Sequence, residues 1–339
     1  MPFTKFDRDT LNLLPLAERQ HDLDLGCLVY PDGRAAERAG GPVFSHAAIP
    51  ALADAVRAAK ARGAAVLMMY GGHVIRSGCS PLMIDLMERG YISHFATNGA
   101  GSIHDFELAL IGNTCESVAK YISEGQFGLW KETGRLNEAV RLGAAEGLGF
   151  GESVGKYIWE NNFPNRRISL LANAYRLGVP ATVHIGVGSD IVHEHPNFDG
   201  AAAGKASYDD FLIYTHSITN LDGGVFLNFG SAVAGPEVYL KALAMARNAA
   251  HRRGERITDI TTAVFDLLAI DEDTQVTPPK SDPRYYFRPW KTILSRTVAD
   301  GGVSYYISGE HAKTFPALYN AILTQDPELP RPVAGGGHE

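Results

Sequence analysis

The chain has 339 residues, and its shares of 45% hydrophobic and 20% charged residues are typical of a globular protein with a large core. A formal net charge of -7 argues against a nucleic-acid-binding surface, because phosphate contacts need a basic face. No apolar run approaches the roughly 20 residues that span a bilayer, so we expect no membrane partner. The three cysteines form no CxxC pair and no apolar signal segment begins the chain, so we expect a cytoplasmic protein.

The first 44 residues are mixed in composition and predict an N-terminal arm. The region over residues 64–106 then predicts two strands that each end in a glycine-rich turn and lead into a helix. The strands are residues 64–70 and 92–96, and the turns are residues 71–73 and 97–105. Ligands of a parallel sheet lie beyond the carboxyl ends of its strands, and a helix start favours an anionic group. Two neighbouring turns of this kind suit a nucleotide, although an ordinary tight turn is the alternative at each and no GxGxxG motif is present.

Further strands are predicted at residues 181–185, 224–227, 257–264 and 303–307, with helices between them. Residues 267–289 carry four prolines and predict a loop. The alternation predicts an α/β fold with a doubly wound, mostly parallel sheet and helices on both faces. We expect a single domain over residues 45–325 and a flexible tail over residues 326–339.

Lys291 is a candidate for covalent chemistry, because it follows an aromatic block at residues 285–290. A lysine against partly dry aromatic walls can form an imine with a carbonyl or imine substrate. Trp290 and the tyrosines could also hold a polyamine cation by cation–π contact. The ordinary alternative is an exposed lysine whose stem lies along Trp290.

A group of histidines supports a rival hypothesis. His184, His193 and His195 lie close in sequence, with Asp190 just before the last two. Imidazole nitrogens suit zinc, so the group could serve a metal-dependent hydrolase or lyase. Pro196 follows at once, however, and favours a loop. We therefore assign no metal, and we expect Asp190 and His193 to contact substrate.

Several short motifs, taken in chain order, resemble those of the deoxyhypusine synthase family. The helix start at residues 76–78 and the turn at residues 97–105 are similar to that family's first two ligand turns. Later pieces follow in the same order and together span roughly residues 45–323: residues 186–190, 223–231, 261–266, 290–291 and 308–316.

The resemblance implies an NAD-binding fold, a homotetramer and polyamine chemistry. In that chemistry NAD-dependent oxidation of spermidine gives an imine, and the aminoalkyl group passes through an enzyme lysine to an acceptor amine. Lys291 would form the imine, Trp290 would line the amine pocket, and Asp190 and Asp266 would contact the amine or a ribose. The residues that we assign to the cofactor, from the strand-end turns and the resemblance together, are Gly72, His73, Ser77, Thr97, Gly99, Gly101, Asp105, Thr262, Asp266 and Glu310.

The chain also departs from the family pattern. His104-Asp105 stand where the family has glutamates, residues 228–231 lack its histidine pair, and residues 193–207 have no counterpart. We therefore expect a divergent member whose acceptor, a protein or a small amine, is not the usual translation factor. A nucleotide-binding protein without transferase activity is the remaining alternative.

Overall fold

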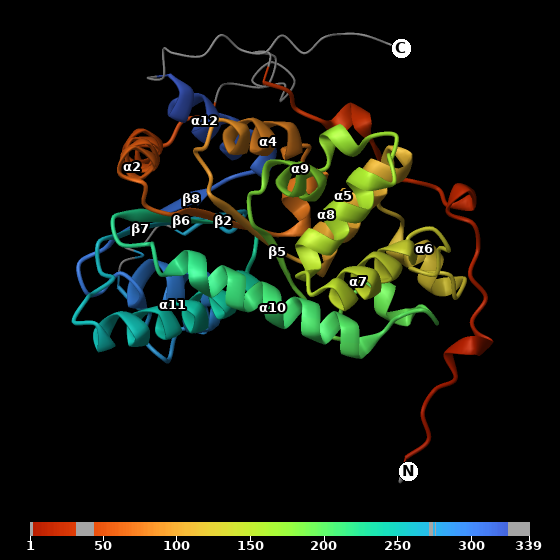
Figure 1. The fold of residues 1–339 in the computed structure, drawn as a ribbon. Helices are drawn as coiled ribbons and strands as arrows, with labels where there is room; N and C mark the ends of the chain where they lie inside the picture. The colour runs from red at the N-terminus through yellow and green to blue at the C-terminus, as the bar shows by residue number, and fades with distance from the viewer. Residues whose placement is uncertain (1–2, 32–43, 271–273, 275, 325–339) are drawn as a thin grey trace.

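The computed structural model describes residues 3–31, 44–270, 274 and 276–324, and a parallel sheet lies at its centre (Figure 1). The sheet has six strands in the order β5-β3-β2-β6-β7-β8. Their bounds are β2 (Val66–Tyr70), β3 (His94–Asn98), β5 (Ala181–His184), β6 (Gly224–Phe229), β7 (Ile260–Asp266) and β8 (Val303–Ser308). Counted along the chain this is the order 3-2-1-4-5-6 of a doubly wound dinucleotide-binding sheet. The order reverses between β2 and β6, which pair directly.

The predicted α/β fold is confirmed. All five pairings within this sheet are parallel. Each of the six predicted strands is present, with ends that shift by up to three residues. Such shifts are expected, because apolar residues that flank a strand also pack into the core.

Helices cover both faces of the sheet because both faces of its strands are apolar. In β2, Val66, Met68 and Tyr70 pack against one face, and Leu67 and Met69 pack against the other. The first face carries α2 (Ala48–Arg62), α3 (Gly72–Arg76), α4 (Ser80–Glu88), α5 (Gly99–Ile111), α9 (Leu170–Leu177) and α12 (His311–Leu323). The second carries α10 (Gly200–Ile218), α11 (Ala234–Arg252) and the π-helix η7 (Pro289–Arg296), and Figure 1 shows α10 and α11 together below the sheet.

A long helical excursion separates β3 from β5. It contains β4 (Asn113–Thr114), α6 (Val118–Ser123), α7 (Arg135–Glu146), α8 (Phe150–Glu160) and η4 (Arg166–Ile168). The α8 helix is hard to recognise in the sequence, because Gly151 and Gly155 interrupt its helical pattern. Both glycines are needed for packing: a Cβ on Gly151 would collide with the Ala181 carbonyl, and one on Gly155 with the Leu171 carbonyl.

Residues 193–207, which the sequence reading treated as an insertion, belong to regular structure. They begin in η5 (Ile191–Glu194) and continue into the first turns of α10. Asp199 caps α10 by accepting hydrogen bonds from the backbone N–H groups of Ala201 and Ala202. Within the described part of the predicted loop over residues 267–289, the chain forms the short helical turn η6 (Pro283–Tyr286), and η7 begins at the last residue of this range.

The N-terminal arm runs along the surface but is anchored in the core. It contains η1 (Arg8–Thr10), η2 (Leu16–Glu18), β1 (Leu23–Asp24) and η3 (Leu25–Cys27), and β1 pairs with β4. Leu16, Arg19 and Leu28 are buried. The single domain over residues 45–325 stays a prediction, and the predicted tail lies outside the described residues. Across the described part of the chain, no helix is long and apolar enough to cross a membrane.

Candidate functional site

The carboxyl ends of β2, β6, β7 and β8 lie side by side at the point where the strand order reverses. Gly71 N donates to Phe229 O at 2.9 Å, and Gly230 N donates to Phe265 O at 3.0 Å. The same pattern joins Gly309 N to Asp266 O at 2.9 Å. The four turns therefore form one rim, which we call the switch-point crevice. Ligands of doubly wound sheets bind at this place.

The glycines of the first turn allow the chain to pack closely around this crevice. A Cβ on Gly71 would collide with the Gly230 carbonyl, so β2 and β6 could not keep their turns together. A Cβ on Gly72 would lie 3.0 Å from His104 Cδ2. Packing alone thus explains both glycines, and it also brings the start of α3 against α5.

The second turn brings the start of α5 next to Asp190. Asn98 caps α5, because its Oδ1 accepts a hydrogen bond from Gly101 N at 3.0 Å. The Asp190 carboxylate fills the space where a Cβ of Gly99 would lie. Burial raises the pKa of Asp190 to about 6.

Asp190 and His193, both predicted to contact substrate, lie together beside this helix start. His193 Nδ1 accepts hydrogen bonds from Gly188 N at 3.1 Å and Asp190 N at 3.2 Å. Its Nε2 is 3.8 Å from Asp190 Oδ2. Burial lowers the pKa of His193. The structure therefore joins two candidates that the sequence could only place on one loop.

Acidic residues and one unpredicted histidine lie on the other side of the crevice. Asp266 ends β7, and Glu310 is exposed at the start of α12, where it pairs with Lys313 at 3.0 Å. His311 is only 4% exposed, and its Nδ1 has no hydrogen-bond partner among the described residues. Burial lowers the pKa of His311, and the Asp266 carboxylate opposes this shift. His311 directly follows the strand-end turn at residues 308–310, and this position in the sequence could have identified it as a candidate.

Three of the predicted cofactor residues point into the protein. Thr97 Oγ1 donates to Tyr70 O at 2.9 Å, and Thr262 Oγ1 donates to Ile293 O at 3.1 Å. Asp105 is 1% exposed and accepts hydrogen bonds from Ser169 Oγ and from the amides of Leu170 and Leu171 at the start of α9. Their polar atoms already have partners, so the geometry gives all three a structural role and we leave them out of the candidate site.

Ser77 likewise forms a local contact, because its Oγ donates to His73 O at 2.8 Å. His73 itself is exposed at the start of α3 and is open to a ligand. The backbone N–H of Gly101 is already used, because it donates to Asn98 Oδ1. The cofactor candidates that remain at the rim are Gly72, His73, Gly99, Asp266 and Glu310.

Lys291 is buried at 9% exposure, so the exposed-lysine alternative does not describe it. Its Nζ lies 4.3 Å from the ring centre of Tyr285 and 6.0 Å from that of Tyr286. Among the described residues Lys291 forms no ion pair. Trp290, also buried, donates from Nε1 to Val276 O at 3.0 Å, and its ring carries the guanidinium of Arg284 at 5.6 Å.

The helix that carries Lys291 starts near the rim, on the α10 and α11 face. Arg288 pairs with Glu237 in the first turn of α11, which itself follows β6 at the carboxyl edge. The chain runs from the carboxyl end of β7 through η7 to the start of β8, at the amino edge of the sheet. The first residues of η7 therefore lie toward the carboxyl edge. Lys291 therefore lies in the first turn of a π-helix that begins toward the carboxyl edge of the sheet, and π-helical turns are often found at functional sites.

The three histidines of the rival hypothesis face different partners. His184 Nε2 lies 3.0 Å from Thr182 Oγ1, and His195 Nε2 lies 2.8 Å from Gly128 O. His193 contacts Asp190. Within residues 3–31, 44–270, 274 and 276–324, no three His, Cys, Asp or Glu side chains converge in a way that could hold a metal ion. The geometry thus gives the metal-dependent hydrolase or lyase no support.

Comparison with known proteins identifies a fold and no family. No protein-family model matches the chain, and no curated protein matches it in sequence. Unliganded AgrE is 12% identical with a TM-score of 0.51, over 83% of this chain and 34% of that one. A protein described as a conserved LOR/SDH protein from Methanococcus maripaludis S2 is 12% identical with a TM-score of 0.48, over 87% and 74%.

A protein described as a deoxyhypusine synthase from Entamoeba histolytica is also among the matches. It is 9% identical with a TM-score of 0.35, over 77% of this chain and 75% of that one. This likeness is too weak to carry an argument. The chain spans about a third of the length of AgrE and of the arginine dihydrolase ArgZ. What the likeness to AgrE shows is the shared α/β fold.

Proposed function

We propose that this chain is an NAD-dependent enzyme that binds the dinucleotide at the switch-point crevice and acts on a small amine. The observation that carries the proposal is the all-parallel strand order 3-2-1-4-5-6 with glycine turns at the reversal between β2 and β6. AgrE, which has the same fold, is described in a ternary complex with ornithine and NAD+. That binding is a property of AgrE, and it makes NAD the first cofactor to test here.

The residues at the rim fit a polar, extended ligand. Gly72, His73 and Gly99 would hold it on the β2 and β3 side, while Asp266 and Glu310 would bind hydroxyls on the β7 and β8 side. Two buried polar atoms near the rim, Asn228 Oδ1 and His311 Nδ1, have no partner among the described residues. An unpaired buried polar atom costs about 1–3 kcal/mol. Polar groups held in this way fit a site that is completed by a ligand.

Lys291 is the residue that we assign to covalent chemistry. Bound NAD would supply the hydride acceptor that turns a C–N bond of the amine into an imine. Lys291 Nζ then adds to the imine carbon and expels the departing amine, so that the aminoalkyl group is held as a lysine imine. An acceptor amine would then displace Lys291 Nζ from the same carbon and release the free lysine. Because bound NAD would both take up and give back the hydride, no net oxidant would be needed.

The surroundings of Lys291 set a condition on this chemistry. Lys291 Nζ lies over the face of Tyr285, where a cation–π contact can hold the side chain in place. Nucleophilic attack needs the neutral amine, so Lys291 must lose a proton before it reacts. Asp190 and His193 are the substrate groups that we place on the opposite side of the crevice.

The resemblance to deoxyhypusine synthases supports the finer proposals. It favours a spermidine-like polyamine as the donor and a homotetramer as the assembly. The departures from the family pattern at residues 104–105, 193–207 and 228–231 favour an acceptor other than the usual translation factor. Light scattering of the purified protein tests the assembly, since a tetramer would have four times the 36.6 kDa mass of the chain.

The test of this function is spermidine-dependent formation of reduced NAD. We expect wild-type protein to produce it, measured by absorbance, and Lys291→Ala to lose transfer of the aminoalkyl group to added amines while its NAD titration stays unchanged. Lys156→Ala, which removes an exposed lysine of α8, is the matched control and should behave as wild type. NAD binding with no amine-dependent reduction would instead identify a nucleotide-binding protein without transferase activity.

A further inference from the structure

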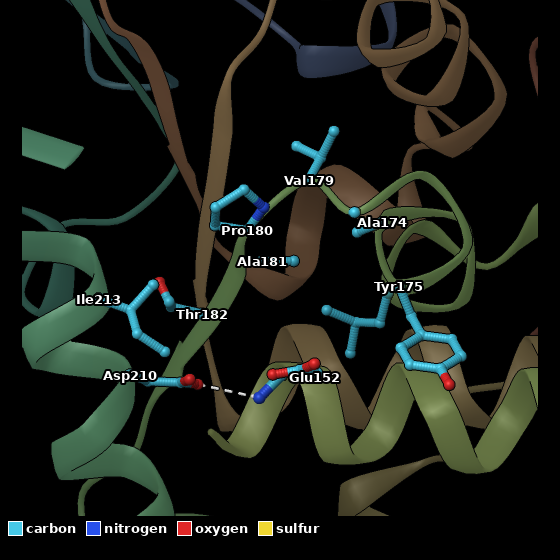
Figure 2. A pocket seen from close by; sticks show the side chains of 12 residues that line it. Glu152, Ala174, Tyr175, Val179, Pro180, Ala181, Thr182, Asp210 and Ile213 are labelled. Carbon is cyan, nitrogen blue, oxygen red and sulfur yellow. Dashed lines mark hydrogen bonds between the residues drawn. The ribbon is translucent and has the colours of Figure 1, made fainter. Parts of the chain in front are cut away.

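A separate cleft opens at the free edge of the sheet, beside the start of β5 (Figure 2). Its volume is roughly 220 Å³, and α8, α9 and α10 form its walls together with residues 178–182. Because β5 enters the sheet here and ends at His184, the cleft lies at the opposite end of the strand from the switch-point crevice. It is therefore not part of the proposed dinucleotide site.

A buried carboxylate, that of Asp210, lies in this cleft. Asp210 is 1% exposed, and its Oδ2 accepts hydrogen bonds from Gly151 N at 2.9 Å, dashed in Figure 2, and from Val183 N at 2.6 Å. These bonds cap the start of α8 and one backbone amide of the edge strand. Oδ1 lies against Gly149, where an added Cβ would collide with it. No hydrogen bond to Oδ1 is found within the described part of the chain, so this oxygen has a packing contact and no hydrogen-bond partner.

Apart from the hydroxyls of Tyr175 and Thr182, the remaining walls are apolar or acidic. Leu171, Ala174 and Ile213 supply aliphatic surface, with Ile213 and Ala174 on opposite sides in Figure 2. Glu152 is exposed at the edge of the cleft, and none of the lining residues is basic. A carboxylate in such a place is poorly solvated and gains most from a cation brought into contact with it.

We propose that this cleft binds a small organic cation, a primary ammonium group on a short aliphatic chain. The ammonium would pair with Asp210 Oδ1, and the aliphatic part would lie against Leu171, Ala174 and Ile213. Roughly 220 Å³ holds an amine of about four or five carbons, and it excludes a nucleotide. This proposal stands independently of the proposed function.

The test uses n-butylamine as the probe, titrated into the full-length protein and followed by calorimetry and by protein NMR. We expect saturable binding of n-butylamine, and none of 1-butanol, which has the same chain without the charge. Asp210→Asn should weaken n-butylamine binding at least tenfold. The variant should fold, because the amide oxygen can take the place of Oδ2 and keep both backbone hydrogen bonds. Asp209→Asn on the same helix, where Asp209 pairs with Lys205, is the matched control and should bind as wild type.

The pH dependence provides a second readout. Burial raises the pKa of Asp210 to about 8, with the amides of Val183 and Gly151 opposing the shift, so the cation must displace a proton at neutral pH. Only the ionised fraction binds, and n-butylamine stays charged, so affinity should rise about tenfold or more from pH 6.5 to pH 9. Ile213→Ala should weaken binding without changing this pH dependence. Equal binding by Asp210→Asn, equal binding of 1-butanol, or no binding at pH 9 would each overturn the proposal.

Discussion

At the scale of single residues, three buried carboxylates each lie at the start of a helix. Asp105 lies at the start of α9, Asp190 at α5 and Asp210 at α8. Burial raises their pKa values to about 6, about 6 and about 8. The positive end of the helix dipole offsets part of this cost, which explains why acids are tolerated at these places.

Asp210 should make the stability of the protein depend on pH. The unfolded chain ionises this group near pH 3.8, whereas the folded protein ionises it near pH 8, so its contribution to stability is full below pH 3.8 and is lost as pH rises to about 8. The asparagine of Asp210→Asn does not ionise, so the variant does not lose stability in this way as the pH rises. The free energy of unfolding of the variant, relative to wild type, should therefore increase between pH 4 and pH 8 by a few kcal/mol, on the order of 1.4 kcal/mol per pH unit at most. Urea denaturation at several pH values measures it, and a constant difference would contradict the assignment.

Sequence reasoning at this scale located side chains along the chain but could not tell which way they face. Asp190 and Asp105 both follow predicted strands, yet one lies beside the crevice and the other caps α9. Their difference depends on which helix packs behind each turn, and that is a property of the tertiary structure. The burial of Lys291 has the same origin, because η6 and η7 lie in or beside a stretch that reads as a loop.

At the scale of elements, the N-terminal arm is joined to α5 by a buried ion pair. Glu107 accepts hydrogen bonds from Arg19 at 2.8 and 2.7 Å, from Thr114 at 2.8 Å and from Thr133 at 2.7 Å. Both charged side chains are at most 2% exposed. The hydroxyl of Thr114 in β4 and that of Thr133 before α7 complete the network. The Glu107 carboxylate thus connects four segments: the N-terminal arm, α5, β4 and the chain before α7.

Glu107→Gln should destabilise the protein by about 3–5 kcal/mol, because it leaves the Arg19 charge buried without a counter-charge. Glu146→Gln is the control: it removes one member of the exposed pair with Lys156 and should cost about 1 kcal/mol or less. Chemical denaturation of the two variants measures both values. Similar effects of the two substitutions would contradict the structural role of the network.

Helices that start or continue through glycine were the hardest elements to predict. The starts of α8 and α10 are hard to recognise in the sequence, because Gly151, Gly155, Gly200 and Gly204 weaken the helical pattern. The close contacts at Gly151 and Gly155 supply the reason for two of them. These contacts are made with β5 and α9, which lie elsewhere in the sequence, so the local sequence pattern does not reveal them.

At the scale of the whole molecule, the strands were the most predictable feature. Each is a short apolar run between turn residues, and a strand that is buried on both faces needs little else to be recognised. Such apolar runs do not reveal which strands are neighbours in the sheet. The crevice depends on the strand order β5-β3-β2-β6-β7-β8. The position of the candidate site therefore follows from topology, and the chemistry assigned to it rests on a few rim residues.

The most direct test of the proposed dinucleotide site is a calorimetric titration of the purified protein with NAD. We expect saturable binding with one NAD per chain, because each chain carries one switch-point crevice in its six-stranded sheet. We also expect Asp266→Ala at the rim to weaken binding, and Asp210→Asn in the separate cleft to leave it unchanged. Absence of NAD binding by the wild-type protein would contradict the central claim and would leave the sheet without its proposed ligand.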